Sequence, residues 1–354
     1  MKTLFVAFDL SSSGGIKDYV LKFMDAVRRA DLDTRAVELK KGGWNEKIIF
    51  VIRLFAVTAA YRPDVVICTN VNFAVPCYLM KVFFGRRYIL NMYGVDAIGV
   101  KGFWRIRAIR GAERIVTLFD WTSRNIVGQF PEAAGKIFSI PNSVDESRFI
   151  TGEKPSYLLK RHNISSSDRV VLTVARMSTL EKIKSSKGYD RVIKALPEVV
   201  NKIPNVRYVL VGTGDDVPNV QNLIRENGLE KYVIMPGAVN DEELVDYYNL
   251  CDVFVLPSKG EGFPAIALLE ALACGKPVIG GNCEDGEKLL LYGKLGIALD
   301  PMDIGKISGA IVSILKNQAP KQLYGEVLRK EALGIYALEK NWERVKNLLN
   351  TFRP

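Results

Sequence analysis

The chain is poor in histidine and shows no paired cysteines. His162 is the only histidine among the 354 residues, and the five cysteines stand singly at positions 68, 77, 251, 274 and 283. One histidine excludes catalytic triads and metal sites that depend on histidine. An odd number of isolated cysteines is typical of reduced thiols, which indicates a cytoplasmic protein.

Long hydrophobic runs and targeting signals are also missing. No apolar run reaches the roughly 18 residues that a membrane-spanning helix requires. The N-terminus passes from Lys2 directly into a strand-like segment and lacks the small-residue cleavage site of a signal peptide. These absences favour a protein that works in the cytoplasm, either free or as a peripheral protein on the cytoplasmic face of a membrane.

Positive charge is present but uneven. The net charge is +10. Residues 1–150 carry 22 Lys and Arg against 14 Asp and Glu, a net charge of +8, whereas the remaining residues carry 27 against 25, a net charge of +2. An anionic partner is therefore expected for the first half of the chain.

Short apolar strands alternate with helices along both halves, which predicts an α/β fold with a parallel, doubly wound sheet in each. Expected strands are 2–8, 34–39, 64–68, 87–91 and 114–118, then 170–174, 208–211, 233–235, 253–256 and 277–279. Expected helices include 18–30, 44–61, 190–201, 217–227 and 242–249. We expect two Rossmann-like domains, 1–155 and 156–336, that face each other across a cleft suited to a ligand. The amphipathic helix at about 337–354 is expected to cross back to the first domain.

Two glutamates bracket an apolar segment in the second half. Glu261 follows the expected strand 253–256 and a loop, and Glu270 lies inside a helix expected to begin near Pro264 or Ala265. Carboxylates are rarely buried without a partner, so both are expected to face a cleft. The free N–H groups of the helix N-terminus suit a diphosphate, and Glu270, about two turns in, suits sugar hydroxyls such as those of ribose. A pair of solvated surface carboxylates is the alternative, and the scarcity of polar residues around them disfavours it.

Cations stand at the end of another strand of the same half. Arg176 follows strand 170–174, and Lys187 with Gly188 opens the next helix. A guanidinium group presents a fork of donors to phosphate oxygens, and an ammonium group presents a compact charge. Together with the glutamates, these two residues predict a phosphate-binding edge; alone, they would be a solvated charged loop.

Glycine-containing turns follow three further strands. Gly14-Gly15 lies between the first strand and the first helix, where glycine lets backbone N–H groups approach a phosphate. Gly212-Thr-Gly214 and Pro236–Val239 follow strands of the second half and expose backbone groups that can bind a base. Each turn taken singly is equally compatible with an ordinary tight turn or βα loop.

In their order and spacing these segments resemble the retaining family-4 glycosyltransferases with the GT-B fold, and the resemblance spans nearly the whole chain. The segments that carry it are Gly14-Gly15, Ala112-Glu-Arg-Ile-Val116, Ile140-Pro-Asn-Ser-Val-Asp145, Val174-Ala-Arg176 with Lys187-Gly188, Val211-Gly-Thr-Gly214 and Pro257-Ser-Lys-Gly-Glu-Gly-Phe263. The resemblance implies transfer of a sugar, as by a hexosyltransferase, from a nucleotide diphosphate sugar to an acceptor. It also implies that no metal or other cofactor is needed.

The resemblance assigns a role to each candidate residue. Arg176 and Lys187 would neutralise the diphosphate leaving group, and Glu261 would contact the donor sugar. Glu270 would hold the ribose. The remaining donor contacts would come from Gly14, Gly15, Tyr93, Asp96, Gly212, Gly237, Ala238, Val239, Phe263, Pro264, Ala265 and Ile266. Donor groups aimed at the leaving group stabilise the charge that develops in the transition state.

The chain departs from the family pattern at two places. The family has seven residues between its two glutamates, and Gly262–Leu269 makes eight. We expect a bulge at Phe263-Pro264 to absorb the extra residue, because proline suits a first helical turn. The family also commonly has histidine where Tyr93 stands, and tyrosine donates a hydrogen bond without carrying a positive charge.

The acceptor side is less defined. Residues 81–114 contain eight basic and two acidic residues with interleaved aromatics, which suits an anionic membrane surface or, equally well, a soluble domain with a basic face. Nucleic acid is not expected, since no known nucleic-acid motif accompanies the basic residues. We expect a glycan or lipid-linked acceptor in surface polysaccharide or glycoconjugate assembly. A nucleotide-sugar epimerase of GT-B fold and a non-catalytic sugar-nucleotide binding protein remain as alternatives.

Overall fold

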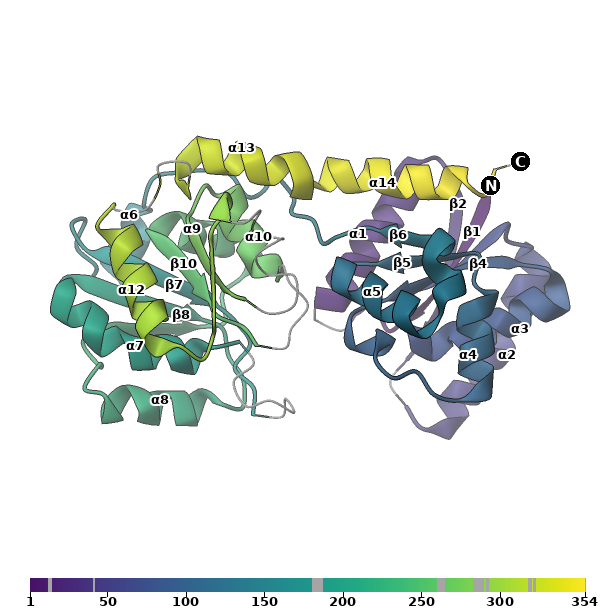
Figure 1. The fold of residues 1–354 in the computed structure, drawn as a ribbon, viewed down its shortest axis with the longest axis horizontal. Helices are drawn as coiled ribbons and strands as arrows, with labels where there is room; N and C mark the ends of the chain where they lie inside the picture. The colour runs from purple at the N-terminus through teal and green to yellow at the C-terminus, as the bar shows by residue number, and fades with distance from the viewer. Residues whose placement is uncertain are drawn as a thin grey trace. The chain divides into compact units, whose positions relative to one another are not determined.

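The computed structural model describes residues 1–11, 15–40, 42–179, 187–259, 265–282, 290, 293–317, 320 and 323–353. They divide into two compact units (Figure 1). Unit 1 comprises Met1–Ser143 together with Leu338–Pro354, and unit 2 comprises Val144–Ala337. The sequence placed the boundary about a dozen residues later along the chain, at 155/156.

Unit 1 is built on a six-stranded sheet of order β2-β1-β3-β4-β5-β6, and every pairing is parallel. Its strands are β1 (Lys2–Phe8), β2 (Asp33–Leu39), β3 (Val65–Cys68), β4 (Arg87–Met92), β5 (Arg114–Thr117) and β6 (Ile137–Ser139). Its helices are α1 (Gly15–Arg29), α2 (Trp44–Tyr61), α3 (Ala74–Phe84), α4 (Phe103–Gly111), α5 (Asp120–Gln129) and α14 (Leu338–Asn350), with short 3-10 turns η1 (Val71–Phe73), η2 (Val95–Ala97) and η3 (Pro131–Lys136). The central strand β3 is apolar and buried at every residue, as expected of a strand covered by helices on both faces.

The last helix, α14, completes unit 1 by packing along α1 (Figure 1). Its buried residues Val345, Leu348 and Leu349 recur at helical spacing, so one stripe of an otherwise charged helix is apolar. The Asn341 amide donates to the carbonyl oxygen of Pro141 at 2.6 Å, and the guanidinium carbon of Arg29 lies 3.6 Å from the ring centroid of Trp342. The prediction that the final helix returns to the first domain is confirmed.

Unit 2 repeats the architecture with a parallel sheet of order β12-β11-β10-β7-β8-β9. Its strands are β7 (Arg169–Val174), β8 (Val206–Val211), β9 (Val233–Gly237), β10 (Val253–Leu256), β11 (Val278–Gly281) and β12 (Ile297–Leu299). Its helices are α6 (Ser156–Arg161), α7 (Tyr189–Lys202), α8 (Val217–Glu226), α9 (Asp241–Leu250), α10 (Ile266–Ala273), α12 (Ile304–Leu315) and α13 (Gly325–Tyr336). Two parallel sheets with helices confirm the predicted α/β fold of two Rossmann-like domains.

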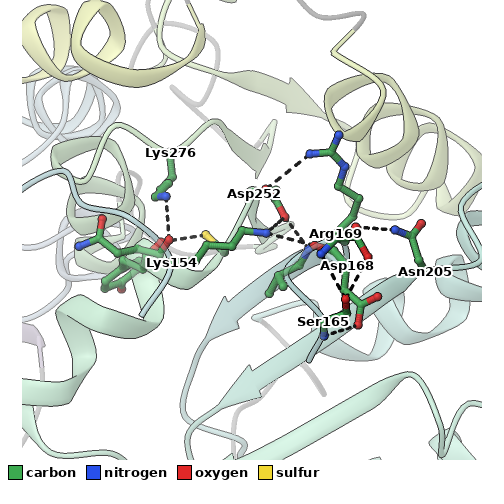
Figure 2. Close-up of polar contacts among 12 residues, drawn as sticks. Lys154, Ser165, Asp168, Arg169, Asn205, Asp252 and Lys276 are labelled. Carbon is green, nitrogen blue, oxygen red and sulfur yellow. Dashed lines mark hydrogen bonds and ion pairs between the residues drawn. The ribbon is translucent and has the colours of Figure 1, made fainter. Parts of the chain in front are cut away.

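A network of charged side chains ties the first residues of unit 2 to the amino edge of its sheet (Figure 2). Lys154 Nζ lies 2.6 Å from Asp252 Oδ2 and donates to the carbonyl oxygen of Asp168 at 3.1 Å. The same Asp252 oxygen accepts the backbone N–H of Val170 at 2.7 Å, at the start of β7. These contacts explain why the polar segment near residue 155, which reads as a linker in the sequence, belongs to unit 2.

Candidate functional site

The order of strands in unit 2 reverses at one point, between β7 and β10. From β7 the chain continues to β8 and β9 on one side, whereas β10 is followed by β11 and β12 on the other. The loops after β7 and β10 therefore diverge at the carboxyl edge, which is where open parallel sheets bind ligands. The described candidate residues of unit 2 all come from this edge or from the helices that begin there.

The two predicted phosphate-binding cations flank the loop that follows β7. Arg176 comes two residues after the strand, is exposed, and forms no ion pair or hydrogen bond with any described residue. Lys187 is half-buried and directly precedes Gly188, the N-cap of α7. The loop 180–186 between them lies outside the described residues.

The start of α7 is held against the end of β10 by two residues that sequence reasoning left without a role. Gly188 has φ +81°, and a Cβ there would lie 2.3 Å from the carbonyl oxygen of Pro257. Arg191, only 5% exposed, donates from Nη1 to the same oxygen at 2.7 Å. An arginine within an amphipathic helix carries no signal that it will be buried. The contact joins the two loops at the reversal point, so the position of Lys187 depends on it.

Glycines bring the loops after β7, β8 and β9 close together. A Cβ on Gly212 would lie 1.9 Å from the carbonyl oxygen of Ala175, and one on Gly214 would lie 1.6 Å from that of Met177. The Gly212 N–H donates to the carbonyl oxygen of Gly237, the last residue of β9, at 2.8 Å. The structure thus brings Gly212 and Gly237 together, and Ala238 and Val239 follow directly.

A side chain that follows β8 also holds the loop that comes after Arg176. Asp215 accepts the backbone N–H of Thr179 at 3.2 Å and also its hydroxyl. The hydrogen bond from Thr179 holds the pKa of Asp215 below its usual range, so this carboxylate is ionised at neutral pH. The backbone is therefore held by contacts both before and after Arg176.

Glu270 lies on α10 and has a defined partner. Helix α10 begins at Ile266, with Ala265 as an N-cap that makes no side-chain hydrogen bond. Glu270 is the fifth residue of the helix, a little more than one turn from its start, so the expectation of two turns was wrong. Its Oε2 accepts a hydrogen bond of 2.7 Å from the hydroxyl of Tyr248, a buried residue of α9.

Of the two predicted glutamates, only Glu270 is among the described residues. Glu261, Phe263 and Pro264 lie outside the described residues, as does the expected bulge. Among the described residues near this loop, Ser258 follows β10 with its hydroxyl buried and without a hydrogen-bond partner. No local pattern distinguishes Ser258, because serine is common in loops.

In unit 1 the candidate residues also gather at a carboxyl edge. Gly15 begins α1, and Gly14 lies outside the described residues. Tyr93 follows β4, and its backbone N–H donates to Asp96 Oδ2 at 3.2 Å. Burial raises the pKa of Asp96. The Tyr93 ring meets that of Tyr19 on α1 edge-on, with centroids 5.6 Å apart.

Polar side chains are buried beside Tyr93. Asn91 is fully buried at the end of β4, and hydrogen bonding from its amide opposes the rise in the pKa of Tyr93 that burial causes. Neither the Asn91 amide nor the Tyr93 hydroxyl has another hydrogen-bond partner among the described residues, and buried polar groups are ordinarily paired, so this end of β4 suits a ligand. Asn91 was not a candidate in the sequence, and its burial is what distinguishes it.

No group of three or more potential metal-ligating side chains is found among the residues that the structure describes. Within the same residues, no helix is both long and apolar enough to cross a membrane.

Comparison with known proteins finds a family whose model matches nearly half of the chain. Residues 158–333 match the model described as glycosyl transferases group 1. Over 252 residues the chain is 27% identical to the GDP-mannose-dependent alpha-(1-6)-phosphatidylinositol monomannoside mannosyltransferase of Mycolicibacterium smegmatis, covering 69% of this chain and 64% of that protein. It is 28% identical over 204 residues to the mannosylfructose-phosphate synthase of Agrobacterium fabrum, covering 55% of this chain and 43% of the relative. The chain thus spans less than two thirds of the length of these relatives.

Solved structures share the fold over the whole chain. Anabaena HepE in complex with UDP has a TM-score of 0.80 at 17% identity, covering 99% of this chain and 100% of that one. The sucrose-phosphate synthase of Thermosynechococcus elongatus has a TM-score of 0.81 at 17% identity, covering 99% of each chain. At this identity the likeness concerns the fold, and it agrees with the two Rossmann-like units described above.

Proposed function

Since the chain belongs, through residues 158–333, to the glycosyl transferases group 1 family, we propose that it is a retaining glycosyltransferase. It moves a sugar from a nucleotide diphosphate sugar to a glycan or lipid-linked acceptor in surface polysaccharide or glycoconjugate assembly. The observation that carries the proposal is the carboxyl edge of unit 2, where an arginine without a partner among the described residues, a lysine and glycine-lined backbone follow adjacent strands.

The leaving diphosphate binds at this edge. Arg176 has no competing ion pair with a described residue, so its guanidinium is available for phosphate oxygens, and Lys187 adds a second positive charge. Both charges stabilise the negative charge that develops as the sugar departs. The N-terminus of α10, with an uncharged N-cap at Ala265, adds backbone donors and a favourable helix dipole.

Neighbouring residues and loops bind the ribose, the base and the sugar of the donor. Glu270 accepts hydrogen bonds from ribose hydroxyls, and the backbone of Gly237, Ala238 and Val239 binds the base. Gly212 keeps the adjacent loop close to this backbone, as its contact with Gly237 requires. Glu261, with Phe263 to Ile266, contacts the sugar and phosphates.

Unit 1 supplies further donor contacts and the acceptor site. Gly15, at the start of α1, and Gly14, which precedes it in the sequence, bind a phosphate oxygen through backbone N–H groups. Tyr93 and Asp96 bind donor-sugar hydroxyls, and the buried Tyr93 hydroxyl beside the Asn91 amide supports this role. No metal is required in this scheme, because cations and backbone donors carry the electrostatic load. The leaving phosphate itself takes the acceptor proton, which lets attack and departure occur on one face of the sugar.

The acceptor and the location are proposed on similar grounds. The Mycolicibacterium relative is named for a lipid-linked acceptor, phosphatidylinositol monomannoside. A lipid-linked acceptor and the basic segment 81–114 together favour action at the cytoplasmic face of a membrane, with the protein attached peripherally.

A thermal-shift screen of nucleoside diphosphates and their sugars tests the function, because a ligand of the native state raises its apparent stability. We expect one base to raise Tm, and the matching nucleotide sugar to be consumed only slowly without acceptor. Arg176→Ala should abolish consumption. If no nucleoside diphosphate or nucleotide sugar shifts Tm, the proposal is wrong. Binding without any turnover, with or without acceptor extracts, would instead identify a binding protein.

A further inference from the structure

Helix α2 exposes an apolar stripe that a solvated helix would not need. Trp44 is 78% exposed and Ile52 is 64% exposed, and Ile48 between them is exposed as well. Their spacing of four residues places the three side chains on one face. The opposite face, with Phe50 and Leu54, is buried against the sheet. Both faces of α2 are therefore apolar, although only one contributes to the core of unit 1.

The apolar exposure continues on the two neighbouring helices. Helix α3 contacts both α2 and α4 (Figure 1). Phe83 of α3 is exposed, and its ring centroid lies 6.0 Å from that of Phe55 on α2. Phe103 and Trp104 are exposed in the first turn of α4. We call the outward side of these helices the α2–α4 surface; it comprises Trp44, Ile48, Ile52, Phe83, Phe103 and Trp104.

Exposed cations accompany these side chains. Lys47 and Arg53 on α2 and Arg105 and Arg107 on α4 are exposed, and none forms an ion pair within 4 Å with a described residue. The guanidinium carbon of Arg107 lies 5.0 Å from the centroid of the Phe103 ring. Cations and large apolar groups are therefore interleaved on one surface.

Other basic residues of segment 81–114 are engaged elsewhere. Arg110 Nε lies 2.6 Å from Glu132, and Lys81 lies 3.8 Å from Glu113. Arg87 donates to the backbone oxygen of Phe352 at 2.7 Å, close to the C-terminus. The structure thus separates the cations that are available to a partner from those that stabilise unit 1.

We propose that the α2–α4 surface docks on an anionic lipid bilayer, with Trp44, Ile48 and Ile52 inserted at the level of the head groups. Apolar side chains interleaved with Lys and Arg suit the boundary between acyl chains and anionic head groups. A second copy of the chain fits less well, because a two-fold contact would place two copies of the same positively charged surface against each other. The proposal adds α2 to the basic segment 81–114 as part of the membrane-binding surface. It rests on the proposed function in one respect: a lipid-linked acceptor explains why the protein binds a membrane.

Flotation with lipid vesicles tests the surface. We expect the full chain to float with vesicles of phosphatidylcholine and phosphatidylglycerol at low salt, and much less with phosphatidylcholine alone. Trp44→Ser combined with Ile52→Ser should weaken binding about tenfold or more. The matched control, Met302→Ser with Val327→Ser, changes side chains that are 56% and 58% exposed in unit 2 and should leave binding unchanged.

The charged part of the surface has its own pair of variants. Arg105→Gln with Arg107→Gln should reduce binding to the anionic vesicles about tenfold or more, since each basic side chain near such a surface contributes on the order of 1 kcal/mol. Lys194→Gln with Lys330→Gln removes two exposed cations of unit 2 and should have no effect.

Three results would overturn the proposal. The first is a wild type that does not float with the vesicles, and the second is a Trp44→Ser/Ile52→Ser variant that binds them as well as the wild type does. The third is a wild type that forms a dimer and binds no vesicles, with the dimer lost in the variant. Nucleotide-induced shifts of Tm in the same variants separate this proposal from the proposed function. Vesicle binding with no nucleotide binding would refute the enzyme alone, whereas nucleotide binding with no vesicle binding would refute the surface alone.

Discussion

The buried hydroxyl of Tyr248 donates a hydrogen bond of 2.7 Å to the carboxylate of Glu270. Burial raises the pKa of Tyr248 well above its usual value, so the phenol stays protonated and acts as the donor. Its ring packs against Phe149 and Phe254, with centroids 5.8 and 5.6 Å away. Tyr248 therefore orients Glu270 from within the core of unit 2.

Tyr248→Phe removes this hydrogen bond while keeping the aromatic packing. We expect the variant to bind a nucleoside diphosphate about three- to tenfold more weakly, since a hydrogen bond to a charged group contributes roughly 1.5–3 kcal/mol, only part of which acts through Glu270. Calorimetry measures the affinity for a ribonucleoside diphosphate and for its 2′,3′-dideoxy analogue. The loss of affinity should be confined to the ribonucleoside diphosphate, because only this ligand has the hydroxyls that Glu270 binds. Tyr247→Phe, which breaks a contact with His162 instead, is the control. Equal weakening of both nucleotides would show that Tyr248 is purely structural.

Arg176→Ala tests the leaving-group role. Because Arg176 is exposed and unpaired among the described residues, its loss should leave Tm within about 1 °C while reducing kcat about a hundredfold or more. Steady-state kinetics at saturating donor, with thermal denaturation alongside, check both parts. Arg225→Ala, on the surface of α8, should behave as the wild type. A near-normal kcat in Arg176→Ala would contradict the assignment.

Gly214→Ala tests the close approach of the loops after β7 and β8. The new Cβ would lie 1.6 Å from the carbonyl oxygen of Met177, at a backbone φ of +157° that side chains rarely adopt. We expect loss of at least about 2 kcal/mol of stability together with loss of nucleotide binding. Gly309→Ala, in a helix where a Cβ meets nothing within 4 Å, should be neutral or slightly stabilising. Denaturation followed by circular dichroism distinguishes them, and a fully stable Gly214→Ala protein would show that the loops are spaced differently.

Asp96 predicts a pH dependence for unit 1. Its folded pKa is raised, chiefly by burial, so the folded state binds the proton more tightly than the unfolded state. The resulting stability is fully present below the unfolded pKa and is lost as pH rises through the folded pKa. Asp96→Asn keeps an acceptor for the Tyr93 N–H but cannot titrate, so its stability relative to wild type should increase from about pH 4 to pH 7.

Tryptophan fluorescence is a suitable probe of the stability of unit 1, which contains Asp96. All four tryptophans, at positions 44, 104, 121 and 342, belong to unit 1. Urea denaturation followed by tryptophan fluorescence therefore reports on this unit. A stability difference between Asp96→Asn and wild type that is constant over this pH range would contradict the prediction.

Much of the architecture was predictable because the period and length of apolar runs reflect burial directly. Strands β1 and β10 and helix α2 have the predicted bounds, and the other predicted strands differ by a few residues at their ends. The resemblance to glycosyltransferases was confirmed by the match of residues 158–333 to the group 1 model, and the assignment to the retaining family 4 stays a prediction. Strands β6 and β12 were missed, since each has only three residues and gives no periodic signal.

The candidate site was predictable to the level of loops. Arg176, Lys187 and Glu270 follow the expected elements, but their roles stay predictions, as do those of Glu261, Phe263 and Pro264. Arg191 and Tyr248 were not predictable, because their hydrogen bonds join residues 66 and 22 positions apart. No local pattern records such a pairing.

By itself, the sequence determined the two α/β halves, the family resemblance and the strand ends that carry polar residues, because these depend on local periodicity and on short motifs. Tertiary structure decided which groups remain available to a partner. It showed that Arg176 has no partner among the described residues while Arg191 is buried against Pro257, and that α2 has a second apolar face exposed beside exposed cations. Pairing and exposure depend on contacts between distant segments, and only the folded chain brings those segments together.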